Sequence, residues 1–206
     1  VPGEQPTDPN VIKLNTNENP YPPSPAIMAA AASFDASCLR RYPDPLCTAL
    51  REQLADLHGC APRNILVGNG SDEVLALCTR AFVEDDGTIG YLDPSYSLYP
   101  VLAAIRGVAT RPVTLNERFE WTLADVGASS LFFFVNPHAR TGRLSPREDV
   151  CALIERAGGV VVVDEAYADF ARENSMDIAL SSDRVLVART FSKSYALAGL
   201  RVGYGI

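Results

Sequence analysis

Two apolar runs, Leu131-Phe132-Phe133-Phe134-Val135 and Val160-Val161-Val162-Val163, are separated by a stretch with helical spacing, residues 146–157. Both runs have the length of a strand, and neither alternates between apolar and polar residues, which indicates strands that are buried on both faces. A third short run, Val185-Leu186-Val187, follows further along the chain. Buried strands that alternate with helices predict an α/β fold, in which helices cover a mainly parallel sheet on both sides in three layers.

The same alternation extends toward the N-terminus. Helices and strands are expected in turn over residues 46–57, 65–67, 71–83, 88–92, 96–105 and 108–113. Ser71 is the expected N-cap of the helix that it opens, whereas Pro100 weakens the case for the helix at 96–105. Residues 203–206 have the composition of a further strand, and we expect the natural protein to continue beyond them.

The first 25 residues predict an extended arm. They include seven prolines, which fix φ and remove backbone donors. Residues 11–14 are the one apolar patch of this arm and could add a short strand to another element, and a helix is expected over residues 26–34.

The composition is that of an ordinary globular chain with an acidic surface. The 206 residues are 47% hydrophobic and carry a formal net charge of −7. Nucleic acid is not expected as a partner, because phosphate backbones must be neutralised by Lys and Arg. The five cysteines are odd in number and contain no Cys-x-x-Cys pair. We therefore expect reduced thiols that pack as small core hydrophobes, without disulfides or a zinc site.

Targeting signals are not visible in the sequence. No apolar stretch approaches the ~20 residues that a membrane helix needs. A basic leader followed by a hydrophobic block is also missing. We therefore expect a cytoplasmic protein that does not enter a membrane.

Three polar segments follow expected strands, at the edge where open parallel sheets bind ligands. The first, Gly68-Asn69-Gly70-Ser71-Asp72-Glu73, opens a helix whose free N–H groups suit a phosphate, although a plain glycine turn with a Ser cap has the same pattern. The second, Asp164-Glu165-Ala166-Tyr167, places an acid at the end of a buried strand, where it requires a cation or donors. A protonated ring nitrogen would serve, as would a helix terminus. A metal is disfavoured, because no cluster of His and carboxylates accompanies the acid.

The third segment, residues 190–203, is the most specific. Lys193 lies among hydroxyls and small apolar residues, and Arg201 follows eight positions later. Partial burial near another cation lowers the pKa of a lysine, so its amine can attack a carbonyl. The hydroxyls and Arg201 can bind a phosphate dianion. A solvated surface lysine is the alternative, but few charges surround this one.

In this order and spacing, the three segments resemble those of the fold-type I pyridoxal-phosphate (PLP) aminotransferases, and in particular the histidinol-phosphate aminotransferases. Leu14-Asn15-Thr16-Asn17-Glu18-Asn19-Pro20 and the Tyr21-Pro22-Pro23-Ser24-Pro25 that follows are similar to that family's N-terminal signature, and Arg41-Tyr42-Pro43 also matches. The resemblance spans essentially the whole chain. It implies an arm at residues 1–30 that contacts the substrate site and a dimer partner. Residues 31–206 would be the PLP-binding large domain, without the family's smaller C-terminal domain.

The resemblance also implies roles for individual residues. Lys193 would carry the cofactor covalently and then move a proton between substrate and cofactor carbons. Asp164 would pair with the ring nitrogen and keep the ring an electron sink, and Tyr167 would hydrogen-bond the phenolic oxygen of the ring. The other implied contacts are ring stacking by Tyr96, phosphate binding by Gly70, Ser71, Asp72, Thr190, Ser192 and Arg201, phosphate binding in the neighbouring subunit of a homodimer by Tyr42, and substrate contact by Asn19 and Tyr21.

One departure from the family pattern follows the Phe-rich run. The family has Asn-Pro-Asn-Asn-Pro-Thr-Gly, and this chain has Asn136-Pro137-His138-Ala139-Arg140-Thr141-Gly142. The family's second Asn of the adjacent pair donates to the phenolic oxygen of PLP, which Ala139 cannot do. One hydrogen bond to a charged group contributes about 1.5–3 kcal/mol. We expect PLP still to bind, but the pKa of the imine that it forms with Lys193 to be raised. Tyr167, His138 or Arg140 could compensate for the missing hydrogen bond.

The implied activity is transfer of an amino group between L-histidinol phosphate and 2-oxoglutarate in histidine biosynthesis. An aromatic aminotransferase and a threonine-phosphate decarboxylase are alternatives, because substrate choice depends on a few pocket residues. A PLP-fold protein that binds the cofactor or a ligand without transamination is the alternative from another class. Ala139 supports that alternative, whereas Lys193, Asp164, Tyr167 and Arg201 argue against it. Because the family's C-terminal Arg residues are not in this chain, we expect the chain alone to hold PLP without turnover.

Overall fold

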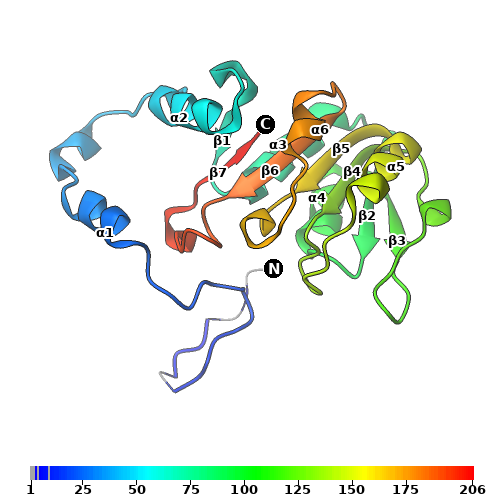
Figure 1. Ribbon diagram of the computed structural model, residues 1–206, viewed down its shortest axis with the longest axis horizontal. Coiled ribbons are helices and arrows are strands. Elements are labelled where there is room, and N and C mark those ends of the chain that lie inside the picture. Colours follow the sequence, from blue (N-terminus) through cyan, green and yellow to red (C-terminus); the bar gives the residue numbers. More distant parts are fainter. Residues whose placement is uncertain (1–2, 4, 9) are drawn as a thin grey trace.

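The computed structural model describes residues 3, 5–8 and 10–206, and its core is a seven-stranded sheet (Figure 1). The strands are β1 (Leu66–Gly68), β2 (Thr88–Asp93), β3 (Ala109–Thr114), β4 (Ser129–Val135), β5 (Gly158–Asp164), β6 (Val185–Thr190) and β7 (Gly203–Gly205). The α-helices are α1 (Pro25–Ala32), α2 (Thr48–His58), α3 (Ser71–Phe82), α4 (Leu98–Arg106), α5 (Arg147–Ala157) and α6 (Met176–Leu180). Short 3₁₀ helices are η1 (Ala36–Arg40), η2 (Pro62–Asn64), η3 (Leu123–Asp125), η4 (Ala168–Phe170) and η5 (Ala198–Leu200).

The sheet is mainly parallel, as predicted. Its strand order is β1-β7-β6-β5-β4-β2-β3, and only the pairings of β7 with β6 and with β1 are antiparallel. The register places Tyr91, Phe133, Val162 and Leu186 in one row across four neighbouring strands. Because the parallel strands end at the same edge, the segments that follow β5 and β6 lie next to each other.

The Phe-rich strand β4 separates two apolar cores. Phe132 and Phe134 pack toward α5 and α6, whereas Leu131 and Phe133 face α3 and α4. All four side chains have no exposed surface. This alternation confirms that the apolar runs are strands buried on both faces, in a three-layer α/β arrangement (Figure 1).

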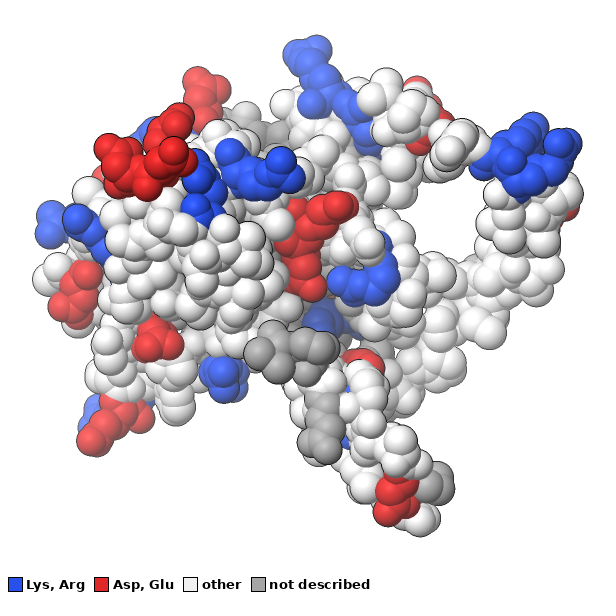
Figure 2. Space-filling model, turned by 180° about the vertical axis from the view of Figure 1, so that it is seen from behind, with Lys and Arg blue, Asp and Glu red and all other residues white. Residues whose placement is uncertain are grey.

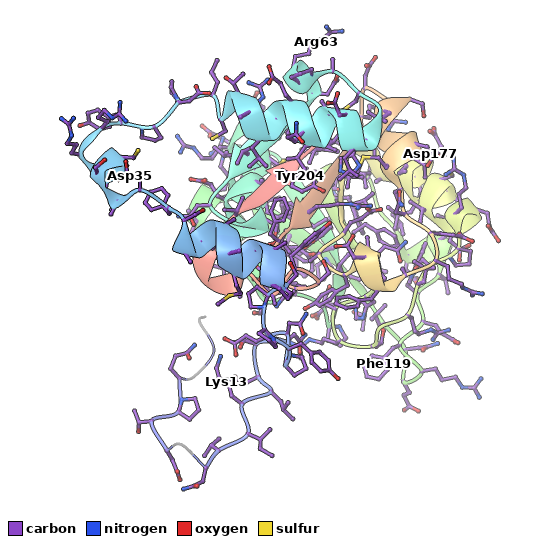
Figure 3. All side chains as sticks on the ribbon, turned by 60° about the vertical axis from the view of Figure 1, so that its left-hand side comes forward. Lys13, Asp35, Arg63, Phe119, Asp177 and Tyr204 are labelled. Atoms are coloured by element: carbon purple, nitrogen blue, oxygen red, sulfur yellow. The ribbon has the colours of Figure 1, made fainter. Side chains whose placement is uncertain are left out.

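The segment between the arm and α2 stands away from the rest of the chain. Helix α1, whose residues are all described, buries none of its side chains, and neither does η1. Figure 2 shows open space between this segment, which we call the arc (residues 25–47, beginning within the last part of the expected arm), and the body. The chain returns to the body at α2, which packs through Leu54 on Tyr204 of β7, and Figure 3 shows Asp35 out on the arc.

Three expectations about the fold need correction. Residues 11–14 form no strand within the described chain. The N-cap of α3 is Gly70, with φ of 80°, and Ser71 is the first helical residue. Among the thiols, which are all free, Cys78 is buried and Cys60 is partly buried, but the other three are exposed.

Pro100 does not break α4, because it lies in the first turn, where the backbone N–H lacks an intrahelical partner.

None of the helices among the described residues is long and apolar enough to cross a membrane.

Candidate active site

The three polar segments converge at one edge of the sheet. Strand β5 ends at Asp164 and its neighbour β6 ends at Thr190, which pairs with Gly203 of β7. A Cβ on Gly203 would lie 2.3 Å from the backbone nitrogen of Ser71. The glycine therefore allows the start of α3 to approach the two strand ends closely, and the three segments line one site.

Asp164 is a buried carboxylate at this edge, with 3% of its surface exposed. Its Oδ2 accepts a hydrogen bond from the Tyr99 hydroxyl at 2.8 Å, and its Oδ1 accepts one from the backbone N–H of Ala166 at 3.2 Å. Burial raises the pKa of Asp164 to about 6, although both donors oppose that shift. A carboxylate in this position would be stabilised strongly by a cation, and a protonated ring nitrogen is such a group.

Lys193 lies half-buried in the turn after β6. Its Nζ donates to the backbone oxygens of Thr16 at 2.7 Å and of Asn17 at 3.3 Å, and it lies 5.7 Å from the centroid of the Tyr167 ring. Burial lowers the pKa of Lys193, and the charge on Arg201 acts in the same direction. A lowered pKa increases the fraction of neutral amine, the form that attacks a carbonyl carbon.

The start of α3 and the turn after β6 form a site suited to an anion. The N-cap Gly70 carries no side chain, and a Cβ there would lie 2.4 Å from Nη2 of Arg201. Nη1 of Arg201 is 3.5 Å from the Ser192 hydroxyl, and the Thr190 hydroxyl donates to Ser192 Oγ at 2.9 Å. Backbone N–H groups, hydroxyls and a guanidinium thus gather around Gly70, a set of donors that matches a phosphate dianion.

Tyr96 connects this donor cluster to the buried acid. Its hydroxyl donates to Oδ1 of Asp72 at 3.0 Å, and Asp72 also lies 3.4 Å from Nη2 of Arg201. The Tyr96 ring contacts the ring of Tyr99 edge-on, with centroids 5.6 Å apart. The aromatic ring predicted to stack on a cofactor is therefore held between the expected phosphate site and the partner of Asp164.

Tyr167 has an amide donor at its hydroxyl, but that donor is not at position 139. Its oxygen accepts a hydrogen bond from Nδ2 of Asn17 at 2.9 Å. Ala139 and Tyr167 line the same cavity, of about 330 Å³. His138 and Arg140, the other expected substitutes for the missing amide, are bonded elsewhere. The ring nitrogens of His138 meet Thr141 Oγ1 and Pro94 O, and Nε of Arg140 donates to Ser95 O.

The arm reaches the site, and the arc does not. Asn19 Nδ2 donates to the backbone oxygens of Lys193 at 3.0 Å and Ser194 at 3.3 Å. Tyr21 follows on the arm with 76% of its surface exposed. Tyr42 lies on the arc, fully exposed, and is not brought to the site of its own chain.

A buried ion pair supports the ends of both strands. Arg189 of β6 makes two hydrogen bonds to Oε2 of Glu165, at 3.0 and 2.7 Å, and Glu165 is 2% exposed. The other oxygen of Glu165 accepts from the backbone N–H of Ser175. Nη1 of Arg189 also lies 3.6 Å from Asp169, which accepts a hydrogen bond from Ser194. These contacts link the turn that follows Asp164 to the turn that holds Lys193.

Sequence reasoning missed Tyr99, Asn17 and the Glu165–Arg189 pair. Tyr99 lies three residues after Tyr96, a spacing that would put both on one face of the helix expected over residues 96–105, and this signal could have identified it, although α4 begins at Leu98. Asn17 is in the signature segment, but nothing in the sequence links it to a residue 150 positions away. The described part of the chain contains no group of three or more His, Cys, Asp or Glu side chains that could hold a metal ion.

The side chains fit PLP at both of its charged ends. A Cβ on Gly70 would lie 2.4 Å from Nη2 of Arg201, so a side chain there would have to displace the guanidinium from its place beside the start of α3. Asp164 is buried, and among the described residues no cationic side chain forms an ion pair with it. A phosphate at the first position and a protonated pyridine nitrogen at the second would complement these features.

Comparisons with known proteins show the family. Residues 9–206 match the model of the family described as aminotransferase class I and II. Histidinol-phosphate aminotransferase 1 of Bradyrhizobium diazoefficiens is 49% identical over 100% of this chain and 59% of its own length, and that of Syntrophotalea carbinolica is 47% identical over 100% and 60%. The chain thus spans about three fifths of the length of these curated relatives.

A solved structure shows the same fold. The crystal structure of histidinol-phosphate aminotransferase from Sinorhizobium meliloti, in complex with pyridoxal-5'-phosphate, matches with a TM-score of 0.84 and 28% identity. The match covers 93% of this chain and 55% of that one. Since the family model covers nearly all of the chain and both strand ends carry the expected side chains, the chain belongs to the class I and II aminotransferases.

Proposed function

We propose that this chain binds PLP and serves an aminotransferase that moves an amino group between L-histidinol phosphate and 2-oxoglutarate. One observation carries the proposal. A half-buried lysine of lowered pKa, Lys193, lies at the end of β6, and the buried carboxyl of Asp164 ends the adjacent strand β5. The names of the relatives, at 47–49% identity, support the choice of histidinol phosphate as the amine.

The titratable side chains have separate tasks in this proposal. PLP supplies an electron sink that stabilises negative charge on the substrate's carbon. The carboxylate of Asp164 would hold the proton on the ring nitrogen, because a buried carboxylate is stabilised by a positive partner. Nζ of Lys193 would carry the cofactor and would move a proton at the substrate carbon as general base. The Tyr167 hydroxyl donates to the phenolic oxygen.

The remaining residues bind and orient. The phosphate is held by N–H groups at Gly70, Ser71 and Asp72 and by the side chains of Thr190, Ser192 and Arg201. Tyr96 stacks on the ring, an orientation that its hydrogen bond to Asp72 supports.

In this proposal the arm supplies the substrate contacts, and a second copy of the chain contributes to the phosphate site. Asn19 and Tyr21 contact the substrate from the arm, which lies over the turn of Lys193. Tyr42 reaches the cofactor phosphate of a second subunit in a homodimer. The exposure of Tyr42 and the absence of buried side chains in α1 and η1, all of whose residues are described, support this assignment.

The domain division and the location follow. Residues 1–30 are the arm and residues 31–206 are the PLP-binding large domain, with a smaller domain supplied by the part of the relatives' length that this chain does not span. We place the protein in the cytoplasm. The exposed free thiols of Cys38, Cys47 and Cys151 support a reducing compartment.

The test uses the full-length protein, purified with PLP and reduced with borohydride. We expect peptide mass spectrometry to find the reduced cofactor on Lys193, and Lys193→Ala to lose it. In the unreduced protein, histidinol phosphate should convert the cofactor absorbance to that of the amine form, and 2-oxoglutarate should restore it.

Three results would contradict the proposal. An unmodified Lys193 after reduction would exclude its role as the cofactor lysine. If PLP is bound but an aromatic amino acid or threonine phosphate reacts faster than histidinol phosphate, the substrate assignment is wrong. A bound cofactor that no amine converts would indicate a binding protein without transaminase activity.

A further inference from the structure

Asn17 occupies a defined position between the arm and the site. Its Nδ2 donates to the hydroxyl oxygen of Tyr167 at 2.9 Å, and its backbone oxygen accepts from Nζ of Lys193 at 3.3 Å. Since an amide nitrogen only donates, the Tyr167 oxygen is the acceptor in this bond. The hydroxyl hydrogen of Tyr167 then remains available to donate to a third group.

Contacts on both sides hold Asn17 in place. Before it, Nζ of Lys13 bonds the hydroxyl of Thr16 at 2.7 Å and forms an ion pair with Glu18 at 2.6 Å. After it, the amide of Asn19 bonds two backbone oxygens of the turn that contains Lys193. The short segment that contains Asn17 is therefore anchored on both sides, and this fixes the direction of the Asn17 amide.

The cavity beside Tyr167 has no amide at position 139. Ala139 lines the 330 Å³ cavity that Tyr167 also lines, so no side chain at position 139 can donate a hydrogen bond there. The neighbouring polar side chains, His138 and Arg140, are directed to the turn at Pro94 and Ser95. Within the described chain, the donor to Tyr167 comes from the arm alone.

We propose that Asn17 is a positioning residue that orients the Tyr167 hydroxyl toward the phenolic oxygen of the cofactor, in place of an amide at position 139. The inference rests on the proposed function, because it assigns that oxygen as the acceptor. It adds a task for the arm that is separate from substrate contact. The arm completes the hydrogen bonding of the cofactor itself, before any substrate binds.

The effect has a measurable sign. A donor to the phenolic oxygen stabilises that oxygen as an anion. The stabilised anion holds less tightly the proton that it shares with the nitrogen joining the cofactor to Lys193, so this proton is lost at a lower pH. Without Asn17, the Tyr167 hydroxyl is free to rotate away, and the bound cofactor should keep its proton to a higher pH. The midpoint of the pH-dependent absorbance change of bound PLP therefore reports the orientation, in the absence of substrate.

Asn17 also has a backbone reason to be asparagine. Its φ is 52°, in the left-handed region that favours Gly and Asn. Asn17→Gly keeps this backbone conformation and removes only the amide, so it separates the two roles. Asn10→Gly is the matched control, because Asn10 lies on the same arm and its side chain bonds only to Asp8 among the hydrogen bonds of the described residues.

We expect Asn17→Gly in the full-length, PLP-loaded protein to raise the midpoint by about one pH unit, equivalent to a tenfold change in proton affinity. Asn10→Gly should leave it unchanged. In a Tyr167→Phe background, Asn17→Gly should have no further effect, because its route of action is gone. In an Ala139→Asn background, which should itself lower the midpoint by restoring the missing donor, the effect of Asn17→Gly should be smaller than in the parent protein.

Three outcomes would overturn the inference. They are an unchanged midpoint in Asn17→Gly, an equal shift with and without the Tyr167 hydroxyl, and an equal shift with and without an amide at position 139. Each of these requires that the parent protein binds PLP and shows a titrating absorbance. If the parent protein shows no cofactor absorbance at all, the proposed function fails, and that result is distinct from these three.

Discussion

The hydroxyl of Tyr99 lies 2.8 Å from Oδ2 of Asp164, and both side chains are buried in the layer between α4 and the sheet. The Tyr99 ring stacks on Phe133 of β4, with centroids 4.9 Å apart and an interplanar angle of 14°. This packing fixes the direction of the hydroxyl. The charge state of the acid at the end of β5 is therefore linked to a residue on a different element, close to the predicted stacking ring of Tyr96.

In the pH–rate profile of the half-reaction with amine, Tyr99→Phe should move the acid limb, where the rate falls as the pH decreases, to higher pH. The hydroxyl stabilises the carboxylate and opposes the rise in the pKa of Asp164 that burial causes. Without it, more of the acid is protonated near pH 7, and less carboxylate remains for a ring nitrogen. We expect the acid limb of the half-reaction with amine to rise by about one pH unit, a change of 1.4 kcal/mol.

Tyr91→Phe is the control for that variant. Tyr91 packs against Tyr99 with ring centroids 6.2 Å apart, but the side-chain hydrogen bond that Asp164 accepts among the described residues comes from Tyr99. Loss of its hydroxyl should leave the acid limb in place. Equal shifts in the two variants would show that packing, rather than the hydrogen bond, sets the pH dependence.

Asp164→Asn should raise the free energy of unfolding of the cofactor-free protein. The same change should weaken PLP binding. The native pKa of about 6 lies above the usual 3.8, so the folded protein binds more protons than the unfolded one between these values. The contribution of Asp164 to stability therefore decreases as pH rises through this window. Removal of the charge should raise the free energy of unfolding at pH 7.5 by about 1–3 kcal/mol. Urea unfolding at pH 4 and 7.5 checks this, and an equal gain at both values would contradict it.

Gly70→Ala should reduce PLP affinity strongly. The added Cβ would lie 2.4 Å from Nη2 of Arg201, and φ of 80° is unfavourable for alanine. The displaced guanidinium can no longer support a phosphate, so we expect an affinity loss of about tenfold or more, since hydrogen bonds to charged groups contribute about 1.5–3 kcal/mol. Gly107→Ala, with a similar φ of 78° and no atom within 4 Å of the new Cβ, isolates the backbone strain. Equal losses of PLP affinity would remove Arg201 from the explanation.

Arg189→Met should destabilise the chain by about 3–5 kcal/mol, because it leaves the buried carboxylate of Glu165 without its partner. Glu165→Gln combined with Arg189→Met should recover much of that loss. Arg147→Met removes an exposed pair with Asp177 and should cost about 0–1 kcal/mol. Thermal or urea unfolding measures all three. A double variant no more stable than Arg189→Met alone would show that the ion pair is not the cause.

Much of the fold follows from the sequence because the strands are apolar on both faces. A run such as residues 131–135 has no exposed side, so only a covered sheet accommodates it. The sequence predicts a site at Asp164 and Lys193 because both follow buried strands. The carboxyl ends of parallel strands meet at one edge of the sheet, where ligands bind. The positions of these two residues depend on local sequence and strand order alone.

The contacts that were not predicted depend on three-dimensional placement. The bond from Asn17 to Tyr167 joins residues 150 positions apart, and the arm has no periodic pattern that fixes its path. Tyr99 could have been placed on the face of Tyr96, but its reach to Asp164 depends on how α4 sits on the sheet. The sequence predicts Ser71 as the cap because Ser is a common N-cap, whereas Gly70, with its positive φ, is the cap in the structure and the helix starts at Ser71.

The position of β7 has a consequence for the order in which the chain is synthesised. Strands β1 and β6 do not pair with each other, and β7, formed by residues 203–205, fills the place between them. On a ribosome, the glycine turn that opens α3 emerges more than a hundred residues before the strand that aligns it with the lysine turn. The two halves of the anion site therefore come into register only after Gly203–Gly205 has left the exit tunnel, and a nascent chain shorter than that has no complete place for a phosphate.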